Sequence, residues 1–165
     1  MARLRTCGGV AARALELLIH TAVRSGDIRG ARAGEFDLAA GLWSVPAARL
    51  KTRRTRNGEQ LNVPLSDAAA AIVAPLLEGK APEALVFPGQ TGKALSDMSL
   101  SAVLRRLKVV GATVHGFRSS FSSWRADDGR FEPEVAEAAL GHKVPGVAGI
   151  YQRGELLSRR AELMA

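Results

Sequence analysis

The sequence is poor in cysteine and in aromatic residues. Its 165 residues include one cysteine, Cys7, and one tyrosine, Tyr151, and aromatic residues make up 5% of the chain. A lone cysteine excludes an intrachain disulfide and fits a reducing compartment. The cysteine and the three histidines fall at no spacing typical of a structural zinc site. We therefore expect a domain that relies on neither disulfides nor a structural metal.

Long hydrophobic runs are also missing. The longest spans ten residues, Ala68 to Leu77, about half of what a membrane-spanning helix requires. The N-terminal stretch carries positive charge but no apolar core of about seven residues, so no secretory signal is visible. With 47% hydrophobic residues, the chain is long enough for one domain with a buried core. We expect a single soluble, cytoplasmic domain over 1–165.

Acidic residues are outnumbered. The chain has 23 basic and 16 acidic residues, a net charge of +7 and a pI near 10.5, which indicates a polyanionic partner. The segment 49–56 reads RLKTRRTR, with five basic residues among eight and no acid. It is either a solvated surface loop or a segment that contacts nucleic-acid phosphates. The candidate DNA contacts are Arg49, Arg53, Arg54 and Arg56.

Apolar periodicity predicts a mainly helical chain with one small sheet. Helical spacing favours a buried amphipathic helix over 10–23, which Arg24, Ser25 and Gly26 end. Short β-prone runs at 36–38, 42–45 and 61–63, with an Asn-Gly turn signal at 57–58, favour an antiparallel sheet. The predicted fold class is α+β, mainly α, as a helical bundle with a small three-stranded antiparallel sheet.

Capping residues place two helices in the middle of the chain. Ser66 and Asp67 open one toward Leu77, and Pro75 is expected to kink or shorten it. A Ser-Asp pair at 96–97 is expected to cap the other, whose apolar face includes residues 100, 103, 104 and 107.

Three further helices follow. Phe117, Phe121 and Trp124 recur at i, i+4 and i+7, which predicts the buried face of a helix. Pro133 suits the first turn of the next helix, and Gly141 suits a left-handed cap at its end. The last helix runs through residues 156, 157, 161 and 164.

The stretch HGFR places His115 and Arg118 on one face of their helix, away from the aromatic residues. A protonated imidazole and a guanidinium repel each other, and no acid follows before Asp127. An anion would relieve this repulsion. Arginine offers a planar fork of donors suited to phosphate, and a neighbouring histidine can bond an oxygen or move a proton.

Four other polar residues have ordinary interpretations when taken singly. Arg24 could offset the C-terminal dipole of the preceding helix. His142 could be a structural histidine, Lys51 a surface lysine and Tyr151 a packing residue with a bonded hydroxyl. Together with the His-Arg pair, they form a set suited to metal-free phosphoryl transfer. Fixed cations stabilise charge on nonbridging oxygens, and a tyrosine can be the covalent nucleophile.

The order of the motifs is specific. They read HTAVRSGDIRG, a KTRR hairpin ending in LNVPLSD, LVFPG, SDMSLSAVLRRL, TVHGFRSSFSSW, EVAEAALGHK and GIYQRGELLSRRAELM. In this order they resemble the catalytic domain of a tyrosine recombinase, a phage-type integrase of prophages and genomic islands. The resemblance runs from about Ala12 to the last residue, including the nine-residue spacing from His142 to Tyr151. Integrases match only in their last part, so the arm-binding and core-binding domains are expected to be absent.

The resemblance implies a catalytic set of Arg24, Lys51, His115, Arg118, His142 and Tyr151. The two arginines would hold the nonbridging oxygens of the scissile phosphate, with a further hydrogen bond from the second histidine.

The same resemblance implies the covalent chemistry. Tyr151 would attack the phosphorus with His115 as base, and Lys51 would protonate the departing 5′ oxygen. Arg53 and Arg54 lie beside Lys51 in the sequence. The product would be a 3′-phosphotyrosyl enzyme, formed without a metal or nucleotide cofactor. Asp27 stands where the family usually has glutamate.

The implied partner is double-stranded DNA at attachment sites, and no membrane. Related enzymes act as tetramers that exchange the C-terminal helix, a role open to 156–165, and the chain in isolation could be a monomer. The expected location is the bacterial cytoplasm, in association with the nucleoid. Two alternatives stay open: a noncatalytic DNA-binding remnant of an integrase, and a type IB topoisomerase.

Overall fold

The computed structural model describes residues 1–50, 60–142 and 153–165, with side chains throughout except at 153–155. The helices in these ranges are α1 (Ala2–Arg5), α2 (Val10–Thr21), α3 (Ser25–Arg29), α4 (Asp67–Leu77), α5 (Ser99–Arg106), α6 (Gly116–Asp128), α7 (Pro133–Ala139) and α9 (Arg153–Met164). The strands are β1 (Phe36–Asp37), β2 (Leu42–Val45) and β3 (Leu61–Pro64), and two short 3-10 helices span Ala33–Glu35 and Ala47–Arg49. The predicted fold class is confirmed.

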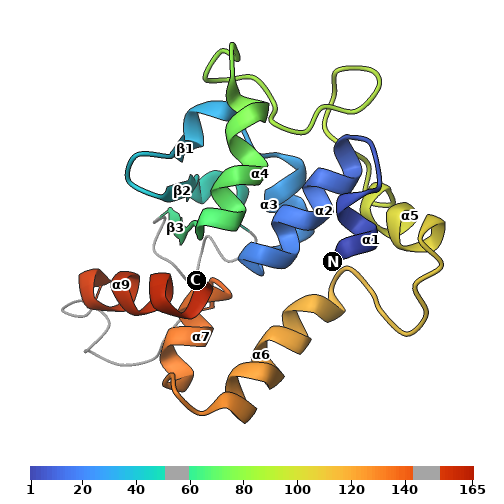
Figure 1. Cartoon of the computed structure of the whole chain (residues 1–165). Coiled ribbons are helices and arrows are strands. Elements are labelled where there is room, and N and C mark those ends of the chain that lie inside the picture. Colours follow the sequence, from blue (N-terminus) through green and yellow to red (C-terminus); the bar gives the residue numbers. More distant parts are fainter. Residues whose placement is uncertain (51–59, 143–152) are drawn as a thin grey trace.

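Helix α2 lies at the centre of the molecule because it is apolar on nearly every side. Ala14, Leu15, Leu17 and Leu18 are all fully buried. The helix contacts α1, α3, α4 and α5. We call these five helices and the sheet the body (Figure 1). A helix buried all round serves as a rigid core for its neighbours.

The sheet is antiparallel with strand order β1-β2-β3, as expected. In β2, Trp43 and Val45 are buried, and Trp43 pairs with Val63 of β3. Phe36 of β1 stacks on Trp43 with ring centroids 5.1 Å apart. The predicted Asn-Gly turn between β2 and β3 lies outside the described residues.

The ends of the two central helices meet the expectations only in part. Helix α4 continues through Pro75 to Leu77, so the proline does not shorten it, and Ser66 caps its start as predicted. Helix α5 begins at Ser99, later than the expected cap. Asp97 instead forms an ion pair with Arg29 of α3. The Asp97 carboxylate, which capping rules assigned to the start of α5, therefore pairs with a residue that is distant in the sequence.

Helices α6, α7 and α9 form a second layer beside the body, in orange and red in Figure 1. We call these three helices the C-terminal layer. Pro133 starts α7 and Gly141, with φ of 68°, follows its end, as predicted. Helix α9 packs on α7 and on β3 of the body.

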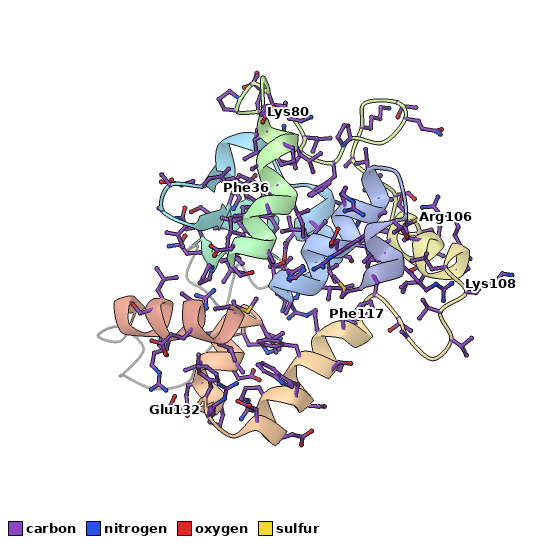
Figure 2. All side chains as sticks on the ribbon, in the orientation of Figure 1. Phe36, Lys80, Arg106, Lys108, Phe117 and Glu132 are labelled. Atoms are coloured by element: carbon purple, nitrogen blue, oxygen red, sulfur yellow. The ribbon has the colours of Figure 1, made fainter. Side chains whose placement is uncertain are left out.

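The aromatic face of α6 is only partly buried. Phe117 packs against the core of the body, where α6 meets it in Figure 2, and Phe121 packs against the small core of the C-terminal layer. Trp124 is 44% exposed, so its predicted burial was wrong. It lies against Phe121 at 6.0 Å between centroids and extends beyond the layer's core. No described helix has the length and apolar character needed to cross a bilayer.

Candidate active site

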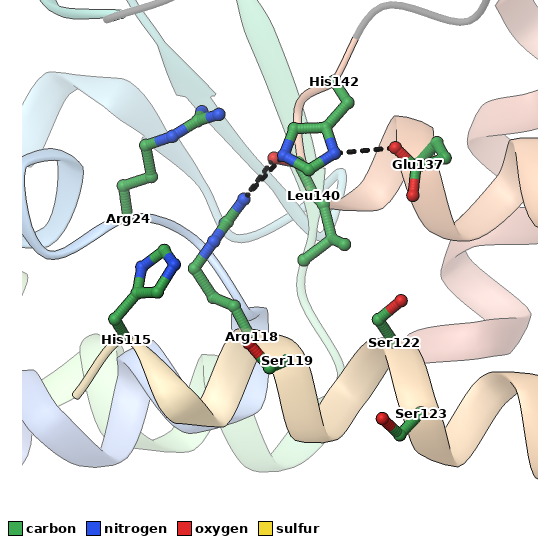
Figure 3. A pocket seen from close by; sticks show the side chains of 9 residues that line it. All are labelled: Arg24, His115, Arg118, Ser119, Ser122, Ser123, Glu137, Leu140 and His142. Carbon is green, nitrogen blue, oxygen red and sulfur yellow. Dashed lines mark hydrogen bonds and ion pairs between the residues drawn. The ribbon is translucent and has the colours of Figure 1, made fainter. Parts of the chain in front are cut away.

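A polar pocket of about 390 Å³ lies between the C-terminal layer and the turn that joins α2 to α3. It is lined by Arg24, His115, Arg118, Ser119, Ser122, Ser123, Glu137, Leu140 and His142 (Figure 3). Four of the six residues predicted for the site thus line one pocket. The other two, Lys51 and Tyr151, lie outside the described residues, as do Arg53, Arg54 and Arg56.

The turn from α2 to α3 brings Arg24 to the pocket. Helix α2 ends in a left-handed residue, Ala22, with φ of 49°. A left-handed cap reverses the chain, and it is strained in a residue other than glycine. Arg24 then takes the extended cap position before α3, where its carbonyl accepts the backbone N–H groups of Asp27 and Ile28. Arg24 therefore sits between two helices and not on the last turn of α2.

The start of α6 places His115. The hydroxyl of Thr113 accepts the backbone N–H of Gly116 at 2.9 Å, which satisfies one free donor of the first turn. A side chain at Gly116 would bring its Cβ within 2.9 Å of the Thr113 Oγ1, so glycine is required for this close approach. His115 precedes the helix, and its carbonyl accepts the N–H of Arg118 at 3.1 Å.

Arg118 joins the two sides of the pocket. It is only 6% exposed. Its Nη1 donates to the carbonyl of Ala22, and its Nη2 donates to the carbonyl of Leu140 at 2.7 Å. One guanidinium therefore connects the end of α2 with the end of α7.

The pKa of the Arg118 guanidinium reflects its burial and the charges around it. Burial and the neighbouring guanidinium of Arg24 lower the pKa of Arg118 to about 10, against the opposing effect of Asp27 and Glu137. Burial also raises the pKa of the Asp27 carboxyl, although Arg24, Arg49 and Arg118 act in the other direction. The guanidinium of Arg24 thus disfavours the charge of Arg118, and an anion between the two would be stabilised.

His142 is positioned by the end of α7. Its backbone N–H donates to the carbonyl of Glu137 at 2.8 Å, which closes the turn around the left-handed Gly141. The ring Nδ1 lies 2.7 Å from Oε2 of Glu137, and Nε2 lies 3.4 Å from Nη2 of Arg118. A Cβ at Gly141 would come within 3.0 Å of Leu61 and 3.6 Å of Nη1 of Arg24. A side chain at this position would therefore press on Leu61, whereas its distance to Arg24 would be an ordinary contact.

Besides Leu140, sequence reasoning missed four polar residues of the pocket. Figure 3 shows Arg24 and His115 on one side of the Arg118 side chain, and Glu137, Ser122 and Ser123 toward the opposite end. The missed set is Ser119, Ser122, Ser123 and Glu137. A signal existed for Glu137, because a helix closed by a glycine brings the residue after that glycine back to the last turn. The serines could have been found from their spacing along α6 from Arg118.

Arg49, predicted to contact DNA, has several partners within the protein. Its Nη1 and Nη2 lie 2.5 and 2.7 Å from the two carboxylate oxygens of Glu35, and Nη1 also donates to the carbonyl of Gly30. The same carboxylate accepts the indole N–H of Trp43 at 3.0 Å. Arg49 therefore anchors the start of the basic segment 49–56 to Gly30 and Glu35.

The pocket offers cationic and hydrogen-bonding side chains, with one exposed carboxylate at its edge. Elsewhere in the described ranges, no group of three or more histidine, cysteine or acidic residues is arranged to hold a metal ion. Chemically, the pocket is suited to binding a tetrahedral anion between Arg24, Arg118 and the two histidines.

Comparison with known proteins identifies the family of the chain. The family model described as "Phage integrase family" matches residues 4–155, so the chain belongs to the phage integrase family.

Individual relatives support the same family. The chain is 32% identical over 155 residues to "Prophage integrase IntZ" of Escherichia coli (strain K12), covering 92% of this chain and 37% of that protein. It is 30% identical over 141 residues to "Integrase" of Enterobacteria phage P4, covering 78% of this chain and 32% of that protein. The chain therefore spans about a third of the length of these curated relatives.

A solved structure shares the fold. The XerA recombinase superposes with a TM-score of 0.60 at 16% identity, over 91% of this chain and 59% of that one. At this identity the likeness concerns the fold alone.

Proposed function

We propose that the chain is the catalytic domain of a site-specific DNA recombinase that cuts and rejoins strands through a 3′-phosphotyrosyl intermediate. The observation that carries the proposal is the convergence of Arg24, His115, Arg118 and His142 on one pocket. The electrostatic penalty that Arg24 imposes on Arg118 supports it, because a phosphate between the two guanidiniums would reduce that penalty.

The roles follow from the chemistry of each group. Arg24 and Arg118 stabilise the charge that gathers on the nonbridging oxygens, and His142 adds a hydrogen bond. Losing one such fixed donor typically costs about 3 to 4 kcal/mol of barrier. His115 accepts the proton of the Tyr151 hydroxyl as its oxygen bonds to phosphorus. Lys51 protonates the 5′ oxygen as its bond to phosphorus breaks. The phosphotyrosyl ester retains the energy of the phosphodiester, so another strand's 5′ hydroxyl can reverse the step.

A suicide substrate tests the proposal directly. The DNA is an attachment-site duplex of the element that encodes the chain, nicked so that the cleaved strand diffuses away. We expect a covalent protein-DNA adduct on denaturing gels, and none with Tyr151→Phe, which keeps the ring and removes only the nucleophilic hydroxyl. Adduct formation by the variant would contradict the assignment of the nucleophile.

The other functions have their own signatures in the same assays. A DNA-binding remnant would bind the duplex and form no adduct with any variant. A topoisomerase would relax a supercoiled plasmid without preference for a site. Either result would contradict the proposal that the chain is a recombinase.

DNA binding by this chain alone should be weak and sensitive to salt, because its contacts would be mainly to phosphates. Filter binding across a salt series measures this, and tight binding above physiological salt would count against it. A tetramer that forms on attachment-site DNA through exchange of the C-terminal helix, in the cytoplasm, completes the proposal.

A further inference from the structure

Glu137 holds His142 at two points. Its backbone carbonyl accepts the N–H of His142 at 2.8 Å, and its carboxylate Oε2 lies 2.7 Å from the ring Nδ1. The other ring nitrogen, Nε2, then faces Arg118, at 3.4 Å from Nη2 (Figure 3). Glu137 therefore determines which nitrogen of His142 is presented to the pocket.

This orientation restricts the protonation of the ring. A neutral imidazole carries one proton, and a carboxylate beside Nδ1 keeps that proton on Nδ1. Nε2 is then an acceptor and can receive a hydrogen bond from Arg118. A phosphate oxygen is also an acceptor, so His142 can bond it through Nε2 only after this nitrogen gains a proton.

The charges around the ring determine when the second proton is stabilised. Arg118 and His115 face the pocket from α6 and its start, Arg24 faces it from the α2–α3 turn, and Glu137 faces it from α7. The carboxyl of Asp27, in α3 of the body, interacts electrostatically with Arg24 and Arg118. Without an anion between them, the two guanidiniums oppose another positive charge. The negative charge of a phosphodiester between them reduces this opposition, and the Glu137 carboxylate compensates the proton from the other side of the ring.

We propose that Glu137 is a positioning residue through which phosphate binding is coupled to proton uptake by His142. The proton comes from solvent and forms an N–H bond at Nε2, which donates to a nonbridging phosphate oxygen, while Nδ1–H stays with Glu137. The inference rests on the proposed function, because it requires the pocket to hold a DNA phosphate.

Nitrogen NMR of the chain with 15N-labelled histidine and arginine tests the coupling. The chain has three histidines, so the rings can be assigned with single His→Gln variants. The probe is sodium sulfate, which stays a dianion where imidazoles titrate, compared with sodium chloride at equal ionic strength. At about pH 7.5, where an ordinary imidazole is mostly neutral, sulfate should move Nε2 of His142 from its unprotonated to its protonated resonance.

Three variants separate charge from position. Glu137→Gln keeps an oxygen that can accept from Nδ1 but removes the charge, so the ratio of protonated to neutral His142 in sulfate should fall about tenfold. Glu137→Ala removes the acceptor as well and should let both neutral tautomers appear. Glu134→Gln, at an exposed position on the same helix, is the matched control and should behave as the wild type.

Two results would overturn the inference. One is that Nε2 stays unprotonated while sulfate shifts the side-chain signals of Arg118 or His115. The other is that Glu137→Gln takes up the proton as readily as the wild type. If sulfate shifts none of the pocket residues, the proposed anion site itself is wrong. The failure of the coupling is thus distinct from the failure of the proposed function.

Discussion

The body and the C-terminal layer are stabilised in different ways. The body has one extensive apolar core built around α2, whose buried residues include Leu15, Leu18 and Trp43. The described core of the C-terminal layer consists of Val135, Ala136, Ala139 and Leu163, with partly buried side chains around it.

Two buried arginines fasten the layer to the body. Arg118 donates to the carbonyl of Ala22 in the body, and the buried Arg160 of α9 donates to the carbonyl of Asn62 in β3. Phe117 adds one apolar contact. Hydrogen bonds between charged donors and carbonyls depend on geometry more strongly than apolar burial does. The position of the layer is therefore sensitive to single side chains.

The candidate site lies along this junction. Arg24 comes from the body, whereas His115, Arg118 and His142 come from the layer. An anion that contacts Arg24 and His142 at once would connect the two regions. We therefore expect the assembly of the site and anion binding to be coupled, because both depend on the same junction between a large core and a small one.

The largest effect is expected for Arg118→Ala. It removes a donor to the phosphate and leaves the buried carbonyls of Ala22 and Leu140 without their partner. We expect adduct formation to fall about a thousandfold and the free energy of unfolding to fall by about 2 to 4 kcal/mol. Arg118→Lys is the matched variant, because it keeps the charge but cannot reach both carbonyls. If urea unfolding finds the alanine variant as stable as the wild type, the polar fastening of the layer is wrong.

Leucine truncations compare the two cores. Leu18→Ala, in the fully buried centre of α2, should lower the free energy of unfolding by about 4 kcal/mol, and Leu163→Ala by about 2 kcal/mol. Native-state hydrogen exchange of the wild type should show the amides of α7 and α9 opening at lower free energy than those of α2. Equal protection in the two regions would remove the distinction between them.

Two glycines offer a matched pair. Gly141 and Gly129 both end helices in the left-handed region, at φ of 68° and 69°. Alanine should cost each about 1 to 2 kcal/mol of stability. Only Gly141→Ala also crowds a neighbour, because its Cβ would lie 3.0 Å from Leu61, whereas nothing lies within 4 Å of a Cβ at Gly129. Urea unfolding should show a larger loss of stability for Gly141→Ala than for Gly129→Ala.

The smallest expected effect is the pH dependence that Asp27 gives to the free energy of unfolding. Asp27 lies in the body, and its carboxyl interacts with Arg24 and Arg118 at the junction. Because its pKa is raised in the folded protein, the folded state holds the proton more firmly than the unfolded state. Its contribution to stability is greatest below the ordinary carboxyl pKa and falls as pH rises through the raised value. The stability of the wild type relative to Asp27→Asn should therefore decline with increasing pH in this range. Urea unfolding at a series of pH values measures this, and an increase would show that the shift has the opposite sign.

Much of the fold could be predicted because its signals are local. Apolar periodicity located α2, and the Ser66 and Gly141 caps were confirmed. The Ser-Asp cap at 96–97 was wrong because Asp97 has an ion-pair partner in α3, distant in sequence. Trp124 was wrongly assigned to the core because periodicity shows which face a residue is on but not where the covering elements end.

Spacing, capping and charge are properties of neighbouring residues, so the sequence was sufficient to predict the longer helices, the sheet and four of the residues that line the pocket. Only the packing of the helices shows that Arg118 connects the two regions and that Arg49 pairs with Glu35. Arg118 and Ala22 are separated by 96 positions in the chain. Such contacts depend on how whole helices pack, and no local pattern of residues encodes them.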